Sequence, residues 1–237
     1  MPPVYDRRLL EVLQRIDNAS RDAARPVPRL LAVSKRHSAT AVADLALAWA
    51  GSGLLLPVSL GENYVQEAVA KRAELNGHDG LPDQEWHLIG HLQANKAREA
   101  ATAFDWVQTV DRARLVDALA RHRPAGGQPL NVLLQVNVDA EAGKHGCAPE
   151  AIPALAEAVS GKPTLRLRGL MAIPTPHEEI ERRRPAFAQL HRLFTDLQAR
   201  YPGVDTLSMG MSDDLEVAIA EGATMVRVGT ALFGART

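Results

Sequence analysis

Several scarcities limit what this chain of 237 residues can be. It has one cysteine, Cys147, so an internal disulfide is impossible. Aromatic residues make up only 4% of the chain, which leaves little surface for stacking nucleic-acid bases. The 27 basic and 28 acidic residues leave a net charge of -1, so no global basic field attracts nucleic acid or an anionic membrane.

Long hydrophobic runs and targeting signals are also missing. The most apolar stretch, residues 39–60, is interrupted by Asp44, Gly51 and Pro57, so it is too broken to span a bilayer as one helix. The N-terminal sequence does not have the basic and then apolar order of a signal peptide. We therefore expect a cytoplasmic protein without membrane insertion, folded as one domain over residues 1–237.

Strand-like and helix-like patterns alternate along the chain. After an opening amphipathic helix, eight short apolar runs are separated from one another by helical periodicity. The predicted strands are 29–35, 54–60, 86–90, 105–110, 130–138, 165–173, 204–209 and 224–229. Eight such units in a chain near the typical ~250 residues predict a closed (β/α)8 TIM barrel. An open doubly wound sheet is the alternative, and the lack of a glycine-rich dinucleotide fingerprint after the first strand disfavours it.

The C-terminal ends of barrel strands carry the active site, so the residues there are the candidates. In the first strand, Leu31, Val33 and Lys35 share one face, which would direct Lys35 into the barrel mouth. Such an amine, kept partly dry, would be nucleophilic toward an aldehyde. The alternative is that the strand ends earlier and Lys35 is a solvated loop residue.

Two turns after the seventh and eighth strands have the composition of a phosphate site. The first is SMGMSDD at 208–214, in which Gly210 permits unusual backbone and Ser212 or Asp213 can cap a helix. The second is RVGT at 227–230, and the loops after strands seven and eight are the recurring phosphate site of this fold. Each turn alone could simply be a helix cap.

Arg227 and Asn63 are further candidates at the mouth. Arg227 alternates with Val226 and Val228, so it should point inward, where it must hold a ligand or pair with a carboxylate such as Glu62. Asn63 begins a helix after the second strand and could bond a ligand, although helix capping is its alternative role.

The remaining histidine and cysteine patterns do not predict a metal site. His87 and His91 share one strand face, but no third ligand with zinc spacing accompanies them, so packing in the core or mouth is favoured. Cys147 lacks a nearby basic pattern that would make it reactive and is interpreted as an incidental thiol.

The motifs together resemble those of the pyridoxal phosphate homeostasis protein family, small single-domain relatives of the alanine racemase barrel. The motifs, in family order, are LLAVSK, GENYVQE, WHLIGHLQANK, TVD, LRGLMAIP, LSMGMSDD and VRVGTALFGAR. The resemblance covers nearly the whole chain. The chain departs from the family pattern in KRHSA, which begins at Lys35, and in SLGEN, which ends at Asn63. These departures affect the expected loop shape and the packing against the ring.

The resemblance implies a fold and a set of binding residues. The fold is the type III pyridoxal-phosphate barrel with an extra N-terminal helix and no C-terminal β domain. Lys35 would hold pyridoxal 5'-phosphate as a Schiff base, and Arg227 would face the pyridine ring. The implied cofactor-binding residues are Lys35, Asn63, Ser208, Met209, Gly210, Ser212, Arg227, Gly229 and Thr230.

The functional hypothesis is a cofactor carrier. A permanent cation near the ring nitrogen weakens the ring as an electron sink, so carbanion chemistry is disfavoured. We expect a monomer that buffers and delivers pyridoxal phosphate, with recipient enzymes as partners and without robust catalysis. The alternatives are a pyridoxal-phosphate-dependent amino-acid racemase or lyase, and a cofactor-free aldolase that uses Lys35.

Overall fold

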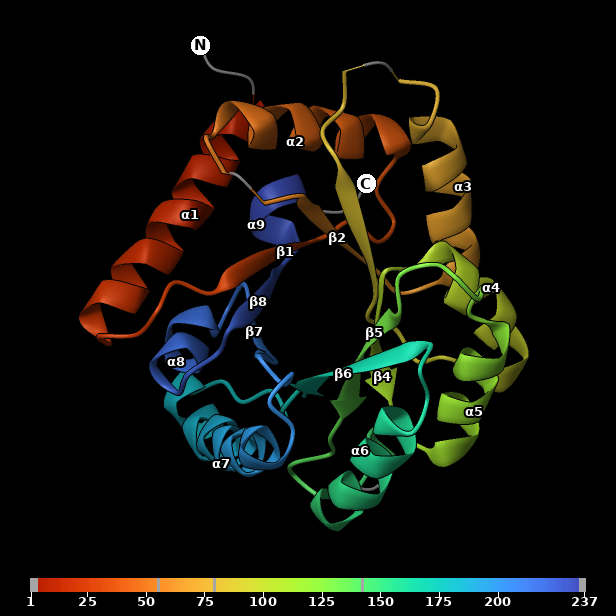
Figure 1. The fold of residues 1–237 in the computed structure, drawn as a ribbon. Coiled ribbons are helices and arrows are strands. Elements are labelled where there is room, and N and C mark those ends of the chain that lie inside the picture. Colours follow the sequence, from red (N-terminus) through yellow and green to blue (C-terminus); the bar gives the residue numbers. More distant parts are fainter. Residues whose placement is uncertain (1–3, 55, 79, 142, 235–237) are drawn as a thin grey trace.

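The computed structural model shows a closed barrel of eight parallel strands. It describes residues 4–54, 56–78, 80–141 and 143–234. The strands follow one another around the barrel in chain order, and β1 pairs with β8 to close it (Figure 1). They are β1 (Arg29–Val33), β2 (Val58–Glu62), β3 (Gln84–Leu88), β4 (Trp106–Val110), β5 (Leu130–Gln135), β6 (Leu165–Met171), β7 (Thr206–Met211) and β8 (Met225–Val228). The predicted (β/α)8 barrel is confirmed, and the open sheet is excluded.

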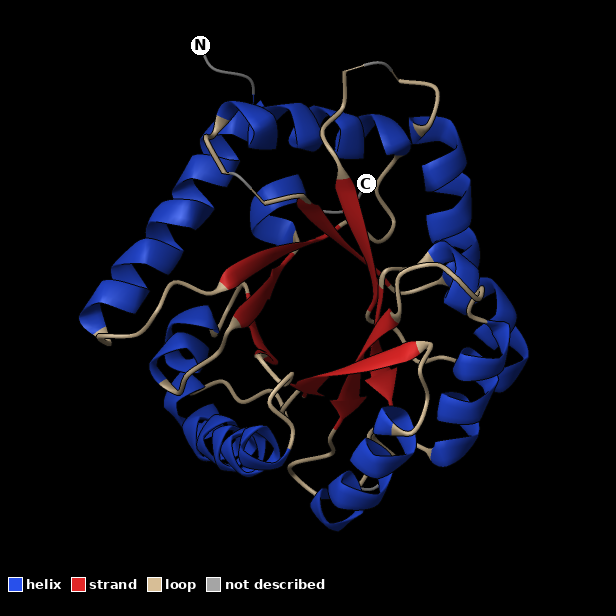
Figure 2. Cartoon of the chain, in the orientation of Figure 1, coloured by secondary structure: helices blue, strands red, loops and turns tan. Residues whose placement is uncertain are grey.

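Helices form a ring outside the strands (Figure 2). They are α1 (Val4–Asp22), α2 (Ala39–Gly51), α3 (Val65–Leu75), α4 (Ala97–Ala103), α5 (Ala113–His122), α6 (Ile152–Ser160), α7 (Arg184–Arg200), α8 (Leu215–Ala220) and α9 (Thr230–Phe233), with short 3-10 turns at Ala94–Lys96, Pro149–Ala151 and Ile180–Arg183. The extra helix α1 buries Leu9, Val12 and Ile16, and it packs against α2, α8 and α9. It therefore ties the first βα unit to the last. No helix in the described part of the chain is both long and apolar enough to cross a membrane.

The apolar residues form two layers. A large cluster lies between the strands and the helices, and a small cluster of Trp106, Leu133 and Met171 is separate from it. The alternation of side chains along each strand places one set outward, toward the helices, and the other set inside the barrel. The barrel interior also holds buried polar residues, and these connect to the site.

Two strand boundaries differ from the prediction in ways that matter for the site. The second strand was predicted at 54–60, but β2 begins at Val58, after Pro57, and Leu56 is exposed; residue 55 lies outside the described residues. Proline has no amide hydrogen to give to a strand ladder, which explains the later start. The first strand was predicted to 35, but β1 ends at Val33.

Candidate functional site

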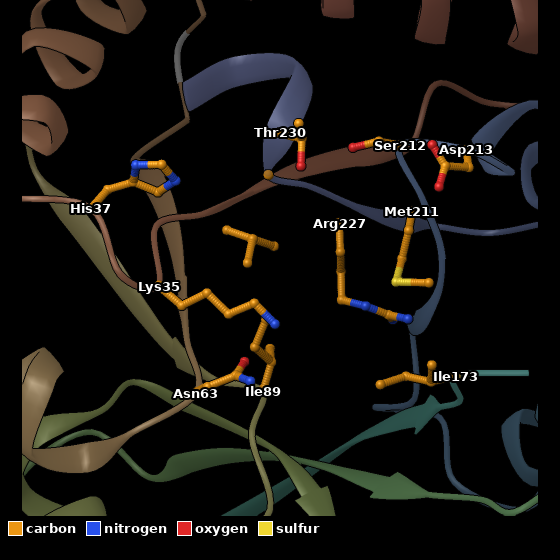
Figure 3. Close-up of a pocket in the computed structure, with 12 residues that line it drawn as sticks. Lys35, His37, Asn63, Ile89, Ile173, Met211, Ser212, Asp213, Arg227 and Thr230 are labelled. Carbon is orange, nitrogen blue, oxygen red and sulfur yellow. The ribbon is translucent and has the colours of Figure 1, made fainter. Parts of the chain in front are cut away.

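A pocket with a volume of about 240 Å³ lies at the C-terminal ends of the strands. Six of the predicted binding residues line it: Lys35, Asn63, Ser212, Arg227, Gly229 and Thr230. Figure 3 shows Lys35 extending into the pocket from one side, with Arg227 on the other side. The pocket therefore brings together residues from β1, β2, β7 and β8 that the sequence places far apart.

Lys35 lies in the turn that follows β1, two residues beyond the end of the strand. If the strand ended early, Lys35 was expected to be a solvated loop residue. The strand does end early, but Lys35 is half-buried and lines the pocket. The next residue, Arg36, has φ of 63°, in the left-handed region that side chains other than glycine rarely adopt. A turn with this backbone needs support from its surroundings, because the conformation is not favoured locally.

A buried network beneath the turn supplies that support. Lys71 of α3 donates from Nζ to the Ser34 carbonyl, to Glu62 Oε1 and to Glu67 Oε1, each at 2.7 Å. The Ser34 hydroxyl also donates to Glu62 at 2.6 Å, and the Arg36 amide donates to Glu67. The residues on both sides of Lys35 are therefore fixed to one ammonium and two carboxylates.

The charge state of Glu62 depends on this network. Its side chain is fully buried, and one of its oxygens has no hydrogen-bond partner. Burial raises the pKa of Glu62, and the hydrogen bonds from Lys71 and Ser34 oppose that rise. Glu62 therefore depends on Lys71 to remain ionised, and it is not available to neutralise Arg227. The alternative pairing of Arg227 with Glu62 is wrong.

Arg227 is a buried cation that is held by neutral groups. It is 4% exposed, and it donates from Nη1 to the Ser208 hydroxyl (2.8 Å) and from Nη2 to the Ala172 carbonyl (2.9 Å). Burial lowers the pKa of Arg227 to about 10, with an opposing contribution from Asp214, so the guanidinium stays charged at neutral pH. Among the described residues, no carboxylate lies within ion-pair distance of it. Its positive charge therefore lies in the pocket wall with neutral groups as its direct partners.

A chain of hydrogen bonds runs from Arg227 through the barrel interior. The Ser208 hydroxyl donates to Gln108 Oε1 at 2.7 Å, and Gln108 Nε2 lies 3.0 Å from His87 Nδ1. His87 Nε2 lies 3.2 Å from Glu85, which also pairs with Arg29. Because Glu85 only accepts, His87 must donate from Nε2 and accept at Nδ1.

The pKa values of both His87 and Glu85 are lowered, for different reasons. Burial lowers the pKa of His87, so its imidazole is neutral. Burial alone would raise the pKa of Glu85, but hydrogen bonds from His87 and Trp106 and the charge of Arg29 outweigh it and hold that pKa far below its usual range. The chain therefore joins a cation at the mouth to a carboxylate at the opposite end of the barrel. Hydrogen bonds to Gln108 and Glu85 engage both ring nitrogens of His87, so its burial requires no metal ion.

A bulge in β7 decides which residues of the 208–214 segment reach the pocket. The pairing of β7 with β8 shifts register between Ser208 and Met211, and Gly210 has φ of 88°. A Cβ on Gly210 would lie 2.5 Å from the Ala218 side chain, so this position requires glycine. Beyond the bulge, Met211 and Ser212 line the pocket.

Ser208 and Met209 do not line the pocket, although both were predicted to contact the ligand. Ser208 is fully buried, and its hydroxyl is engaged by Gln108 and Arg227. Met209 is fully buried in the large cluster under the helices. The prediction treated 208–212 as one turn, whereas β7 continues to Met211 and only the residues after its bulge turn toward the mouth.

Comparison with known proteins identifies the family. A family model described as the N-terminal domain of alanine racemase matches residues 10–237. A pyridoxal phosphate homeostasis protein of Pseudomonas aeruginosa is 54% identical to this chain and is matched over 96% of this chain and 94% of its own length. This chain belongs to the pyridoxal phosphate homeostasis protein family.

Solved structures agree with this assignment. PipY of Synechococcus elongatus PCC7942, solved without PLP, has a TM-score of 0.82 and 37% identity, over 97% of this chain and 99% of PipY. The structure of PipY with PLP bound has a TM-score of 0.79 and 36% identity, over 97% of this chain and 100% of PipY. The family resemblance and the barrel inferred from the sequence motifs are therefore confirmed.

Sequence reasoning missed half of the pocket lining in this family member. The additional residues are Val33, His37, Ile89, Ile173, Met211 and Asp213. His37 stacks on Phe233 of α9, with ring centroids 4.7 Å apart. Most of these residues follow a strand end by a few positions, and although several lie in the quoted motifs, none was assigned to ligand binding. The signal that could have found them was their position in the βα turns and not their residue type.

Proposed function

We propose that this chain binds pyridoxal 5'-phosphate in the pocket at the barrel mouth and acts in intracellular pyridoxal phosphate homeostasis by buffering and delivering the cofactor. The observation that carries the proposal is one pocket lined by both Lys35 and the buried cation Arg227, beside the β7 and β8 turns. Close relatives are named for this homeostasis, and PipY binds PLP. The proposal assigns the same ligand to this chain.

The residues present fit the cofactor. The Lys35 amine would attach its aldehyde carbon as a Schiff base, with release of one water. Ser212, Gly229 and Thr230 line the same pocket beside the turns where this fold binds phosphate. Asn63 lies on the β2 side and would contact a polar edge of the ring. In this proposal Ser208 positions Arg227, and Gly210 turns Ser212 toward the mouth.

Arg227 is the reason for proposing storage of the cofactor without robust catalysis. When bound, the cofactor can serve as an electron sink for carbanion chemistry, and protonation of the ring nitrogen strengthens that sink. Arg227 stays charged at neutral pH and lies across the pocket from Lys35. A fixed cation beside the ring nitrogen discourages its protonation. Binding is then favoured while turnover of amino acids is not.

An absorbance spectrum with added pyridoxal phosphate, followed by borohydride reduction and peptide mass mapping, tests the attachment site. We expect a visible Schiff-base band and one reduced adduct, on the peptide that carries Lys35. Lys35→Ala should lose both, whereas Lys96→Ala, which removes a partly exposed lysine outside the pocket, should keep both. A reduced adduct on another lysine, or no adduct, would overturn the proposal.

A second assay separates storage from catalysis. The loaded protein is incubated with single amino acids, and stereoisomers and keto products are measured by chromatography. We expect no robust turnover, together with transfer of cofactor to an apoenzyme that needs it. Turnover abolished by Lys35→Ala would instead establish the racemase or lyase alternative.

The cellular setting is part of the same proposal. We propose a cytoplasmic monomer whose partners are recipient pyridoxal-phosphate enzymes. The only cysteine of the sequence, Cys147, is buried and unpaired by any disulfide, which is compatible with a reducing compartment. Analytical ultracentrifugation of the loaded protein tests the monomer, and a dimer mass would contradict it.

A further inference from the structure

Three potential metal ligands meet on the rim of the barrel, outside the pocket lining. His91 lies in the segment after β3, Asp111 follows β4 directly, and His145 belongs to the loop between β5 and α6. Since β3, β4 and β5 are neighbours in the barrel, their C-terminal ends lie side by side (Figure 1). One imidazole nitrogen from each histidine and one carboxylate oxygen all lie within 4.8 Å of one another.

We propose that His91, Asp111 and His145 form a binding site for a divalent transition metal, with Zn²⁺ as the ion best suited to the three donors. Two imidazoles and one carboxylate, with a fourth position left for solvent, are a known donor set for this ion. No local sequence spacing marks this cluster, because one ligand comes from a loop 54 residues further along the chain than His91.

The backbone around each ligand is anchored, which reduces the cost of assembling the site. The Thr109 hydroxyl donates to the Gly90 carbonyl at 2.9 Å, directly before His91. Arg112 donates to Asp111 Oδ1 at 2.6 Å and to the Leu92 carbonyl at 3.0 Å, so it connects two of the three segments. A hydrogen bond that orients a ligating carboxylate in this way is a common feature of metal sites. The positive charge of Arg112 will reduce the affinity for a dication.

The loop that carries His145 is fastened to the barrel at that residue and two residues after it. Gln135 donates to the His145 carbonyl at 3.3 Å, and the Cys147 amide donates to the Gln135 carbonyl at 2.8 Å. Between them, Gly146 has φ of 125°, and a Cβ there would lie 2.6 Å from the Asn137 amide nitrogen. This position therefore requires glycine, and the close approach holds His145 over the end of β5.

The two imidazoles are already adjacent and accessible. Their ring centroids are 3.7 Å apart with an angle of 14° between the planes, and both residues are exposed. Donor atoms of a tetrahedral zinc site lie about 3.3 Å apart, given metal–ligand distances of about 2.0–2.2 Å. The rings must tilt from their stacked arrangement to share one ion.

Zn²⁺ titration of the untagged protein against a chromophoric chelator tests the site. We expect one ion per chain, and we expect His91→Ala and His145→Ala each to weaken its binding at least about 100-fold. Asp111→Asn should weaken it to a smaller extent. His78→Ala is the matched control, because His78 is an exposed histidine in the connection before β3, and it should bind like the parent.

A Co²⁺ spectrum gives a second readout that does not depend on the chelator. An intense visible band in the parent, lost in both histidine variants but kept in His78→Ala, would support the three-ligand site. Thermal melts without metal should be nearly the same for the parent and the histidine variants, because the replaced histidines are exposed. Saturable binding with unchanged affinity in His91→Ala and His145→Ala, or no saturable binding in the parent, would overturn the proposal. Neither result bears on attachment of a cofactor to Lys35.

Discussion

Replacing Lys71 with methionine tests the network that supports the Lys35 turn. Lys71 and Glu62 have side chains that are 7% and 0% exposed, and their charged atoms are 2.7 Å apart. Removing one partner of such a pair leaves the other charge buried without compensation, which costs about 3–5 kcal/mol. In a chain of this size, 1 kcal/mol corresponds to roughly 2–4 °C in melting temperature, so Lys71→Met should lower it by roughly 6–20 °C.

The pH dependence of this loss has a definite sign. Burial raises the pKa of Glu62 in the folded protein, so its contribution to stability is greatest in acid and is lost as pH rises through that raised pKa. Without Lys71, the raised pKa should move still higher. The stability deficit of Lys71→Met should therefore be larger at pH 8 than at pH 5, because the unpaired buried carboxylate loses its charge as the pH falls.

Chemical denaturation of the parent and variants at both pH values measures these quantities. The double variant Lys71→Met/Glu62→Gln should recover at least part of the loss, because it removes both charges. Lys162→Met breaks an exposed pair with Asp117 and should leave the midpoint nearly unchanged. A deficit below about 1 kcal/mol, or one that grows in acid, would show that Glu62 is not a charged group held by Lys71. Cofactor affinity should fall in Lys71→Met, because the turn loses its anchor on Ser34.

Two further substitutions and one labelling experiment test other parts of the structure. Gly210→Ala should destabilise the protein by roughly 2–4 kcal/mol in urea denaturation, since it adds a side chain at positive φ against Ala218; a neutral result would contradict the observed bulge. Gln108→Leu should cost about 1–3 kcal/mol by leaving Ser208 and His87 with unpaired polar atoms, whereas Gln128→Leu at an exposed position should not. Burial, with the nearby charge of Asp111, raises the pKa of the Cys147 thiol to about 11. Alkylation of Cys147 at pH 8 should therefore be at least about 100-fold slower in the native protein than in denaturant, and rapid native labelling would be inconsistent with that environment.

The sequence predicted the barrel because its signals are local and repeated. Each strand is a short apolar run, each helix has its own periodicity, and eight repetitions leave few ways to arrange them. Strand ends were less predictable. Lys35 was expected inside the mouth because the strand alternation was extended to residue 35. The structure also places Lys35 at the mouth, but in a turn after the strand, and Lys71 and Glu67 hold that turn.

Contacts between distant segments account for what sequence reasoning missed. Nothing in the local sequence around Arg227 shows that Ser208 and Ala172 will hold it, or that Glu62 will pair with Lys71 instead. His145 likewise meets His91 only because the β5–α6 loop folds back over the end of its strand. Spacing along the chain carries no information on such encounters until the topology is known.

The placement of charges in the barrel explains how the mouth can remain positive. A buried arginine usually requires an adjacent carboxylate, but Arg227 has neutral acceptors as its direct partners. Ser208, Gln108 and His87 connect it to Glu85 at the other end of the barrel, and each of these groups donates in the same direction, away from Arg227. Their aligned dipoles stabilise the guanidinium without placing a negative charge beside it. An anionic ligand in the pocket would then meet a cation whose direct partners are neutral, whereas a carboxylate paired with Arg227 would weaken that attraction.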